Sequence, residues 1–214
     1  MVYKGVRTRT DGEWEQVAIK KVKDTDSMSG AAVDDMEREV NVMKKLSHDN
    51  IVKIVGVLQD GPSIIIVMEY LREGSLDRYL QTNRYMVDFK QLFGYSQNIV
   101  DGMEYLTQNQ IIHRDLAARN ILVADQETVK ISDFGLARQG DSYVMSSATT
   151  IPVKWEALEC LTHRKYSHKS DVWSFGVTLW EMFAYGRNPT MEGCEDYFTT
   201  TERSRCEPPD YLTT

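Results

Sequence analysis

The spacing of apolar residues changes near Gly74, and this change limits the possible folds more than any other feature of the sequence. Before Gly74, β-branched runs at residues 51–58 and 63–69 have the length of strands, and a Gln-Asp-Gly-Pro turn separates them. An Asp-Gly turn precedes a further β-branched run at residues 17–22. The first part of the chain therefore predicts two hairpins of antiparallel strands.

Helical spacing dominates the rest of the chain. Apolar residues recur at intervals of three and four through residues 31–46, and again through residues 92–106 and 172–182. We expect an α+β fold of two lobes with a cleft between them: a small antiparallel sheet lobe over residues 1–70 and a larger helical lobe over residues 71–214. The stripe in the second helix consists of Leu92, Phe93, Ile99, Val100, Met103 and Leu106.

Composition narrows the class of protein. A net charge of -7 argues against general binding to nucleic acid, so protein and small-molecule partners are expected. Cys160, Cys194 and Cys206 lack metal-ligand spacing and are interpreted as free thiols of a reducing compartment, which predicts a cytoplasmic location. The longest aliphatic run, residues 64–68, is far shorter than the roughly 18 apolar residues of a membrane span. A longer parent protein could still be tethered to a membrane.

The most informative motif is His-Arg-Asp-Leu-Ala-Ala-Arg-Asn at residues 113–120. A strand-like run follows it, and Asp-Phe-Gly stands at residues 133–135. Either triplet alone would more often be an ion pair or a chance turn. Together, at this spacing, they resemble the catalytic loop and the metal-binding motif of protein kinases, which implies a protein kinase-like fold and an ATP-dependent phosphotransferase.

The resemblance implies a role for each polar residue of these motifs. Asp115 would accept or orient the proton of the acceptor hydroxyl, while Asn120 and Asp133 would bind Mg²⁺ that bridges the ATP phosphates. Lys20, in a Val-Ala-Ile-Lys strand, would hold the α- and β-phosphates and pair with Glu39, or alternatively with Glu37. Taken singly, such a lysine and an acidic helix would be solvated surface charges.

The hinge between the lobes would bind adenine. Its Met-Glu-Tyr-Leu sequence would offer backbone groups to the adenine edge, and apolar side chains would cover both faces of the ring. The alternative without a ligand is that this segment is the end of a strand that packs in a hydrophobic core. The nucleotide-binding residues implied by the resemblance are Val2, Ala18, Lys20, Met68, Glu69, Leu71 and Leu122.

Two segments favour tyrosine as the acceptor. Arg119, in the Ala-Ala-Arg form of the catalytic loop, and the Ile-Pro-Val-Lys-Trp segment at residues 151–155 are typical of tyrosine kinases. Tyr143 lies where such enzymes phosphorylate themselves, and a phosphate there could pair with Arg114 or Arg138. The Ala-Leu-Glu that follows departs from the usual Ala-Pro-Glu, a form that some receptor kinases share. Near the start of the later helix, Asp171 would hold the catalytic loop from behind.

The resemblance covers roughly residues 2–186 and leaves alternatives open. The glycine-rich phosphate loop of the family would precede Val2, and the last helices of the large lobe are not recognisable after residue 186, so both lobes are expected to be incomplete. The sequence looks Janus-like through residues 37–118 and receptor-like around residues 157–186, which leaves the subfamily open. A signalling tyrosine kinase is the leading hypothesis. A pseudokinase or inactive fragment that serves as a binding module is second, and a serine/threonine kinase is third.

Overall fold

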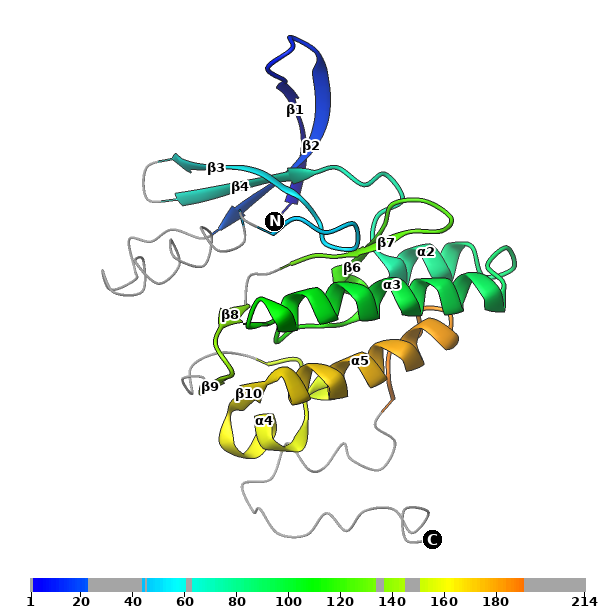
Figure 1. Ribbon diagram of the computed structural model, residues 1–214. Helices are drawn as coiled ribbons and strands as arrows, with labels where there is room; N and C mark the ends of the chain where they lie inside the picture. Colours follow the sequence, from blue (N-terminus) through cyan, green and yellow to red (C-terminus); the bar gives the residue numbers. More distant parts are fainter. Residues whose placement is uncertain are drawn as a thin grey trace, which may run out of the picture.

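The computed structural model describes residues 2–22, 44, 46–60, 63–133, 137–144 and 151–190. A small sheet stands above a larger helical part (Figure 1). The sheet consists of β1 (Val2–Thr8), β2 (Trp14–Val22), β3 (Ile54–Asp60) and β4 (Ser63–Glu69). The helical part contains α2 (Leu76–Thr82), α3 (Phe89–Gln108), α4 (Leu158–His163), α5 (His168–Phe183), the short strands β5 (Ile111–Ile112), β6 (Ile121–Val123), β7 (Val129–Ile131), β8 (Arg138–Gln139), β9 (Ser142–Val144) and β10 (Lys165–Ser167), and the single turns η2 (Ala118–Asn120) and η4 (Val153–Trp155).

The sheet is antiparallel in the order β1-β2-β4-β3, and it contains both predicted hairpins. In the first, the Arg9 amide donates to the Glu13 carbonyl at 2.7 Å, and Gly12 takes a φ of 85°, which a side chain would disfavour. In the second, Asp60 lies opposite Ser63. Both predictions are confirmed by the antiparallel pairing of β1 with β2 and of β3 with β4.

The start of the second hairpin was predicted three residues too early. Ile51 forms a parallel bridge with Ile131 of β7, and the Val52 amide donates to the Ile131 carbonyl at 2.9 Å, so both residues belong to the helical part. The β-branched run alone could not reveal this, because a buried strand and a buried connecting segment have the same apolar pattern.

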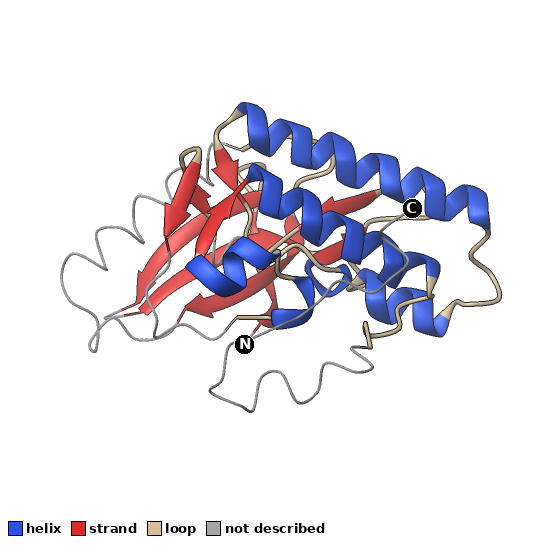
Figure 2. Ribbon diagram, turned by 90° about the horizontal axis from the view of Figure 1, so that it is seen from below, coloured by secondary structure: helices blue, strands red, loops and turns tan. Residues whose placement is uncertain are grey.

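The two later helices occur where the stripes predicted them, whereas the helix predicted at residues 31–46 lies outside the described residues except for Lys44 and Leu46. Figures 1 and 2 show α3 and α5 side by side. Phe93 and Val100 were expected in the buried stripe of α3 but are 53% and 46% exposed. They border a groove of about 500 Å³ between α3 and α5, because they lie at the edge of the stripe rather than at its centre.

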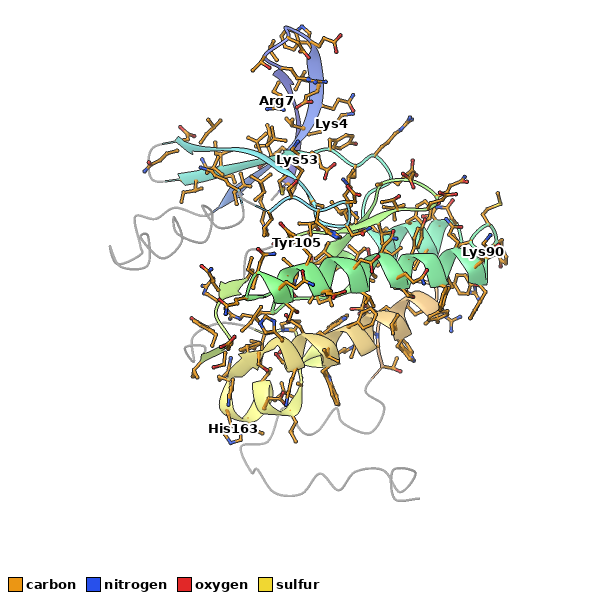
Figure 3. All side chains as sticks on the ribbon, in the orientation of Figure 1. Lys4, Arg7, Lys53, Lys90, Tyr105 and His163 are labelled. Carbon is orange, nitrogen blue, oxygen red and sulfur yellow. The ribbon has the colours of Figure 1, made fainter. Side chains whose placement is uncertain are left out.

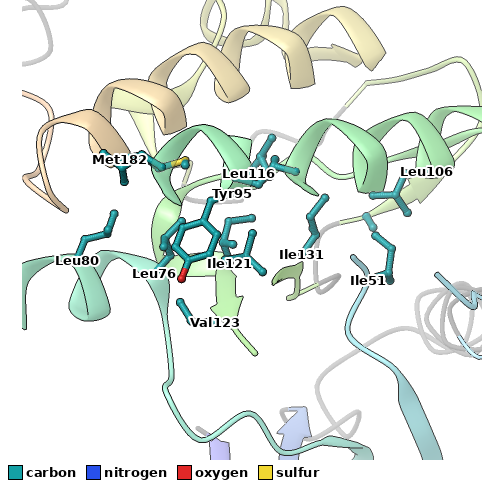
Figure 4. Packing of buried hydrophobic residues seen from close by; sticks show 14 of the residues in the cluster. Ile51, Leu76, Leu80, Tyr95, Leu106, Leu116, Ile121, Val123, Ile131 and Met182 are labelled. Carbon is teal, nitrogen blue, oxygen red and sulfur yellow. The ribbon is translucent and has the colours of Figure 1, made fainter. Parts of the chain in front are cut away.

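The core of the helical part anchors the loop that contains the motif at residues 113–120 (Figure 4). Tyr95 and Leu106 of α3 are fully buried, as is Met182 of α5. Leu116, next to Asp115 in the sequence, is also fully buried in this cluster. Burial of a leucine side chain contributes about 2 kcal/mol, so the loop is anchored through Leu116.

The two parts of the molecule meet at the end of β4. The Lys130 ammonium of β7 lies 2.9 and 3.0 Å from the two carboxylate oxygens of Glu69, and the Lys53 amide donates to the same carboxylate at 2.8 Å. Figure 3 shows Lys53 at this junction. The predicted domain boundary at residues 70 and 71 falls in the link between β4 and α2. Across the described ranges, no helix combines the length and the apolar character needed to cross a membrane.

Candidate active site

The backbone of the predicted catalytic loop, residues 113–120, is held in an unusual conformation. Arg114 takes a φ of 70°, a left-handed conformation that costs about 1 kcal/mol or more for a non-glycine residue. Asp171, in the first turn of α5, accepts the His113 amide at 2.8 Å and the Arg114 amide at 2.9 Å. Burial raises the pKa of Asp171, while His113 and the two amides oppose this shift. The predicted support of the loop by Asp171 is confirmed.

Asp115 is oriented by two side chains of its own loop. Arg119 donates from Nη2 to Oδ1 of Asp115 at 2.5 Å, and Asn120 donates from Nδ2 to Oδ2 at 2.8 Å. The same amide group of Asn120 contacts the Asp115 carbonyl at 2.6 Å. The Asp115 side chain stays 20% exposed, so a hydroxyl can approach a carboxylate whose orientation is already fixed.

Asp133 lies beside Lys20, which comes from the other lobe. The Lys20 ammonium forms an ion pair with Oδ1 of Asp133, and Asp133 has a φ of 59°. The preceding residue, Ser132, donates from its amide and its hydroxyl to the Asn120 carbonyl, each at 2.8 Å. These bonds bring Asn120 and Asp133 to neighbouring positions.

The pair of residues fits Mg²⁺. Magnesium binds oxygen ligands and usually takes only one or two protein side chains besides water and substrate phosphates. Asp133 offers a carboxylate, and Asn120 directs its amide nitrogen toward Asp115, which leaves its amide oxygen available to a metal ion. Glu39, the predicted partner of Lys20, and the alternative Glu37 lie outside the described residues, as do Phe134 and Gly135.

Several predicted adenine contacts come together in the sheet. Ala18 of β2 lies opposite Lys4 of β1 and Met68 of β4. Two positions along β2, Lys20 lies opposite Val2, so it shares a face of the sheet with Ala18. These pairings place Val2, Ala18 and Lys20 together, although Val2 is 56% exposed.

The other adenine contacts come from the hinge and from β6. The Glu69 side chain is bound to Lys130, so only its backbone is available to a nucleotide. Leu71 follows two residues later, and Leu122 of β6 forms a bridge with Ser75 just beyond the hinge.

Arg119 also contacts the segment that was predicted to recognise the acceptor. Its guanidinium lies 4.4 Å from the ring centroid of Trp155 in η4, within the range of a cation–π contact. The Trp155 indole donates to Glu181 of α5 at 2.8 Å. Lys154 reaches in a different direction, to the Pro189 carbonyl at 2.8 Å. The catalytic loop and the acceptor segment therefore meet at Arg119.

Two buried glutamates of this region were missed in the sequence analysis. Glu181 is 3% exposed and Glu156 is 6% exposed. Burial raises the pKa of Glu156 to about 7, the charge of Asp115 adds to this shift, and Cys160 and Arg114 oppose it. A signal was present for Glu181, which interrupts the apolar stripe of α5. Glu156 follows an exposed lysine and a tryptophan, and its burial could not be inferred from that context.

Tyr143 lies between the two arginines that were expected to bind its phosphate. It belongs to β9, opposite Tyr166 of β10. The Arg114 guanidinium lies 4.4 Å from the Tyr143 ring and 4.7 Å from the Tyr166 ring, and Arg138 lies 5.4 Å from Tyr143. Phosphorylation of Tyr143 stays a prediction.

Comparisons with known proteins agree with this geometry. The family model described as protein tyrosine and serine/threonine kinase matches residues 1–214, beyond the range covered by the motifs. The chain is 43% identical over 199 residues to the megakaryocyte-associated tyrosine-protein kinase of Mus musculus, with 92% of this chain and 38% of the relative covered. It is 45% identical over 183 residues to the tyrosine-protein kinase TXK of Homo sapiens, with 83% and 34% covered.

A third relative is the cytoplasmic tyrosine-protein kinase BMX of Mus musculus, which is 42% identical over 183 residues, with 83% of this chain and 28% of the relative covered. The chain thus spans about two fifths or less of the length of the relatives it matches. The names of these relatives do not assign a subfamily to the chain.

Proposed function

Because this chain belongs to the protein tyrosine and serine/threonine kinase family, we propose that it catalyses ATP-dependent phosphorylation of tyrosine residues in proteins. The observation that carries the proposal is the orientation of Asp115 by Arg119 and Asn120, with Arg119 lying against Trp155. Phosphoryl transfer depends mainly on positioning and charge stabilisation, and this arrangement fixes a carboxylate beside the segment that would receive the acceptor.

Asp115 acts on the acceptor hydroxyl. The phenolic oxygen forms a bond to the γ-phosphorus of ATP, the bond from that phosphorus to the bridging oxygen of ADP breaks, and the phenolic proton passes to a carboxylate oxygen of Asp115. Arg119 and Asn120 each bind one oxygen of this carboxylate, which keeps it aimed during the transfer. Leu116 prevents the loop from shifting, because its side chain is fully buried.

ATP and Mg²⁺ are the proposed cofactor set. Bound Mg²⁺ neutralises charge on the phosphates, and Asn120 and Asp133 would hold it. Lys20 would contact the α- and β-phosphates, and Glu39 would pair with it when the site is assembled. The ion pair between Lys20 and Asp133 supports this assignment, because it joins the proposed phosphate-binding lysine to the carboxylate proposed to bind Mg²⁺.

We also propose how the adenine is held. Val2, Ala18 and Leu122 would cover the faces of the ring, with Met68 behind it. The backbone groups of Glu69 and Leu71 would bind its edge. The opposed positions of Ala18 and Met68 in the sheet support this arrangement. The ion pair of the Glu69 side chain with Lys130 supports a backbone role for Glu69.

Tyrosine-bearing proteins are the proposed substrates, and the cytoplasm is the proposed location. The names of the relatives as tyrosine-protein kinases support the first proposal, and the name of BMX as a cytoplasmic kinase supports the second. We expect no binding of nucleic acid, because the net charge is -7.

Acceptor identity provides the test. Transfer of phosphate from ATP and Mg²⁺ is measured to two peptides that differ only by Tyr or Ser at the acceptor position. We expect the tyrosine peptide to be phosphorylated at least about 100-fold faster, because a serine hydroxyl on the same backbone ends several ångströms short of Asp115. Equal rates for the two peptides would show that the acceptor assignment is wrong.

A further inference from the structure

One carboxylate oxygen of Glu181, in α5, accepts hydrogen bonds from both the catalytic loop and η4. Oε2 of Glu181 accepts the Ala118 amide at 2.9 Å and the Trp155 indole N–H at 2.8 Å. Ala118 belongs to the catalytic loop and Trp155 to η4, and the two are far apart in the sequence. Glu181 is only 3% exposed, so these bonds form away from solvent.

Both groups that Glu181 binds are adjacent to Arg119. Ala118 directly precedes Arg119 in the chain, and the Trp155 ring lies 4.4 Å from the Arg119 guanidinium. Arg119 in turn donates to Asp115 at 2.5 Å. A connected set of contacts therefore leads from the end of α5, through the backbone and the ring on either side of Arg119, to the carboxylate of Asp115.

A carboxyl group is suited to this position, because two N–H donors point to one of its oxygens. Hydrogen bonds to a charged acceptor are shorter and roughly twice as strong as neutral ones. Burial raises the pKa of Glu181, while the Ala118 amide, the Trp155 indole and the charge of Arg119 oppose that shift. A glutamine at this position keeps one acceptor oxygen but replaces the other oxygen by an NH₂ donor, which changes what the two N–H groups and Arg119 meet.

We propose that Glu181 is a positioning residue for phosphoryl transfer, which holds Arg119 between the Ala118 backbone and the Trp155 ring so that Asp115 meets the tyrosine hydroxyl. Because Glu181 is only 3% exposed, it would act through Ala118 and Trp155 rather than by direct contact with a substrate. This inference rests on the proposed tyrosine kinase function. It differs from a purely structural role, because it predicts a defect in turnover that ATP binding does not share.

The test compares Glu181→Gln, Trp155→Phe and the double variant with the unmodified chain. Glu181→Gln keeps the shape of the side chain, and Trp155→Phe keeps an aromatic ring beside Arg119 but removes the indole donor. Glu127→Gln, at an exposed turn, is the matched control. Rates are measured with a Glu-Tyr polymer at saturating ATP, and thermal unfolding gives the folded fraction of each protein.

We expect Glu181→Gln to lower kcat per folded molecule by about 10- to 100-fold, the effect of a misplacement of roughly 1 Å, with the KM for ATP unchanged. The losses from Glu181→Gln and Trp155→Phe should not add in the double variant, because they remove one shared contact. A kcat like that of Glu127→Gln, or fully additive losses, would overturn the inference.

Two further outcomes keep the test decisive. If Glu181→Gln does not fold, Trp155→Phe decides, because an unchanged kcat in that variant contradicts the proposed contact. The Asp115→Asn variant separates this inference from the function on which it rests. Transfer that survives Asp115→Asn, or that is absent both from the unmodified chain and from a longer parent protein, overturns the proposed function together with this inference. Transfer that depends on Asp115 but not on Glu181 overturns the inference alone.

Discussion

Lys130 binds both carboxylate oxygens of Glu69, at 2.9 and 3.0 Å, and thereby joins β7 of the helical part to the last residue of the sheet. The two side chains are 19% and 24% exposed, so water screens the pair only in part. Glu69 is the last residue of β4 and lies at the start of the hinge. This ion pair therefore fixes the position of the hinge relative to the helical part.

Replacement of Lys130 by Met should weaken this junction. We expect the free energy of unfolding to fall by about 1 kcal/mol, because Glu69 loses its cation but keeps the Lys53 amide. Urea unfolding at low and high salt measures the change. Lys90→Met, at an exposed site on α3, is the matched control and should cost less than about 0.5 kcal/mol. Equal effects of the two substitutions would show that the ion pair does not stabilise the junction.

Glu156 should make stability depend on pH. Burial raises its pKa from an ordinary value of 4.5 to about 7, so between these values the folded protein binds a proton that the unfolded chain releases. The free energy of unfolding should therefore fall as the pH rises through this window and level off above it. A pKa difference of this size corresponds to a change of about 3 kcal/mol in the free energy of unfolding.

The Glu156→Gln variant isolates this contribution, because glutamine resembles the protonated glutamate and does not titrate. Urea unfolding is compared across the window, and the pH dependence of all other groups cancels in the difference between the two proteins. We expect the variant and the unmodified protein to match near pH 4.5, and the variant to be more stable above about pH 7. A constant difference across the window would contradict the assignment.

Tyr143 should control activation. Incubation with ATP and Mg²⁺ is expected to raise the activity of the unmodified chain, because a phosphate on Tyr143 adds about -1.5 to -2 charge beside Arg114 and Arg138. Tyr143→Phe keeps the ring but cannot accept a phosphate, so its activity should not rise. Tyr85→Phe, at a residue 95% exposed, is the control and should be activated normally. If Tyr143→Phe is activated as strongly as the unmodified chain, phosphorylation of Tyr143 does not control activation.

The elements of the fold were predictable where local spacing determines them. The stripes of α3 and α5 identified both helices, and turn residues identified both hairpins. The pairing and burial of residues at the edges of these elements were not predictable, because tertiary contacts determine them. Ile51 pairs with β7 instead of starting β3, and Phe93 faces a groove.

The site shows the same division between local and long-range information. The motif spacing placed Asp115, Arg119 and Asn120 together, and the structure joins them by hydrogen bonds. The ion pair of Lys20 with Asp133 and the contact of Glu181 with Ala118 each join residues that lie far apart in the chain. No spacing rule covers such pairs, because they depend on how the lobes and helices pack.

The most direct test of the account is the dependence of tyrosine phosphorylation on Asp115. Phosphate transfer from ATP and Mg²⁺ to a Glu-Tyr polymer is measured for the chain and its Asp115→Asn variant, and for the same pair within a longer parent protein. Asp101→Asn, at an exposed site of α3, is the control. We predict that Asp115→Asn lowers transfer by about 100- to 10,000-fold, while Asp101→Asn leaves it unchanged. Transfer that persists in Asp115→Asn, or that is absent from every protein, would contradict the account.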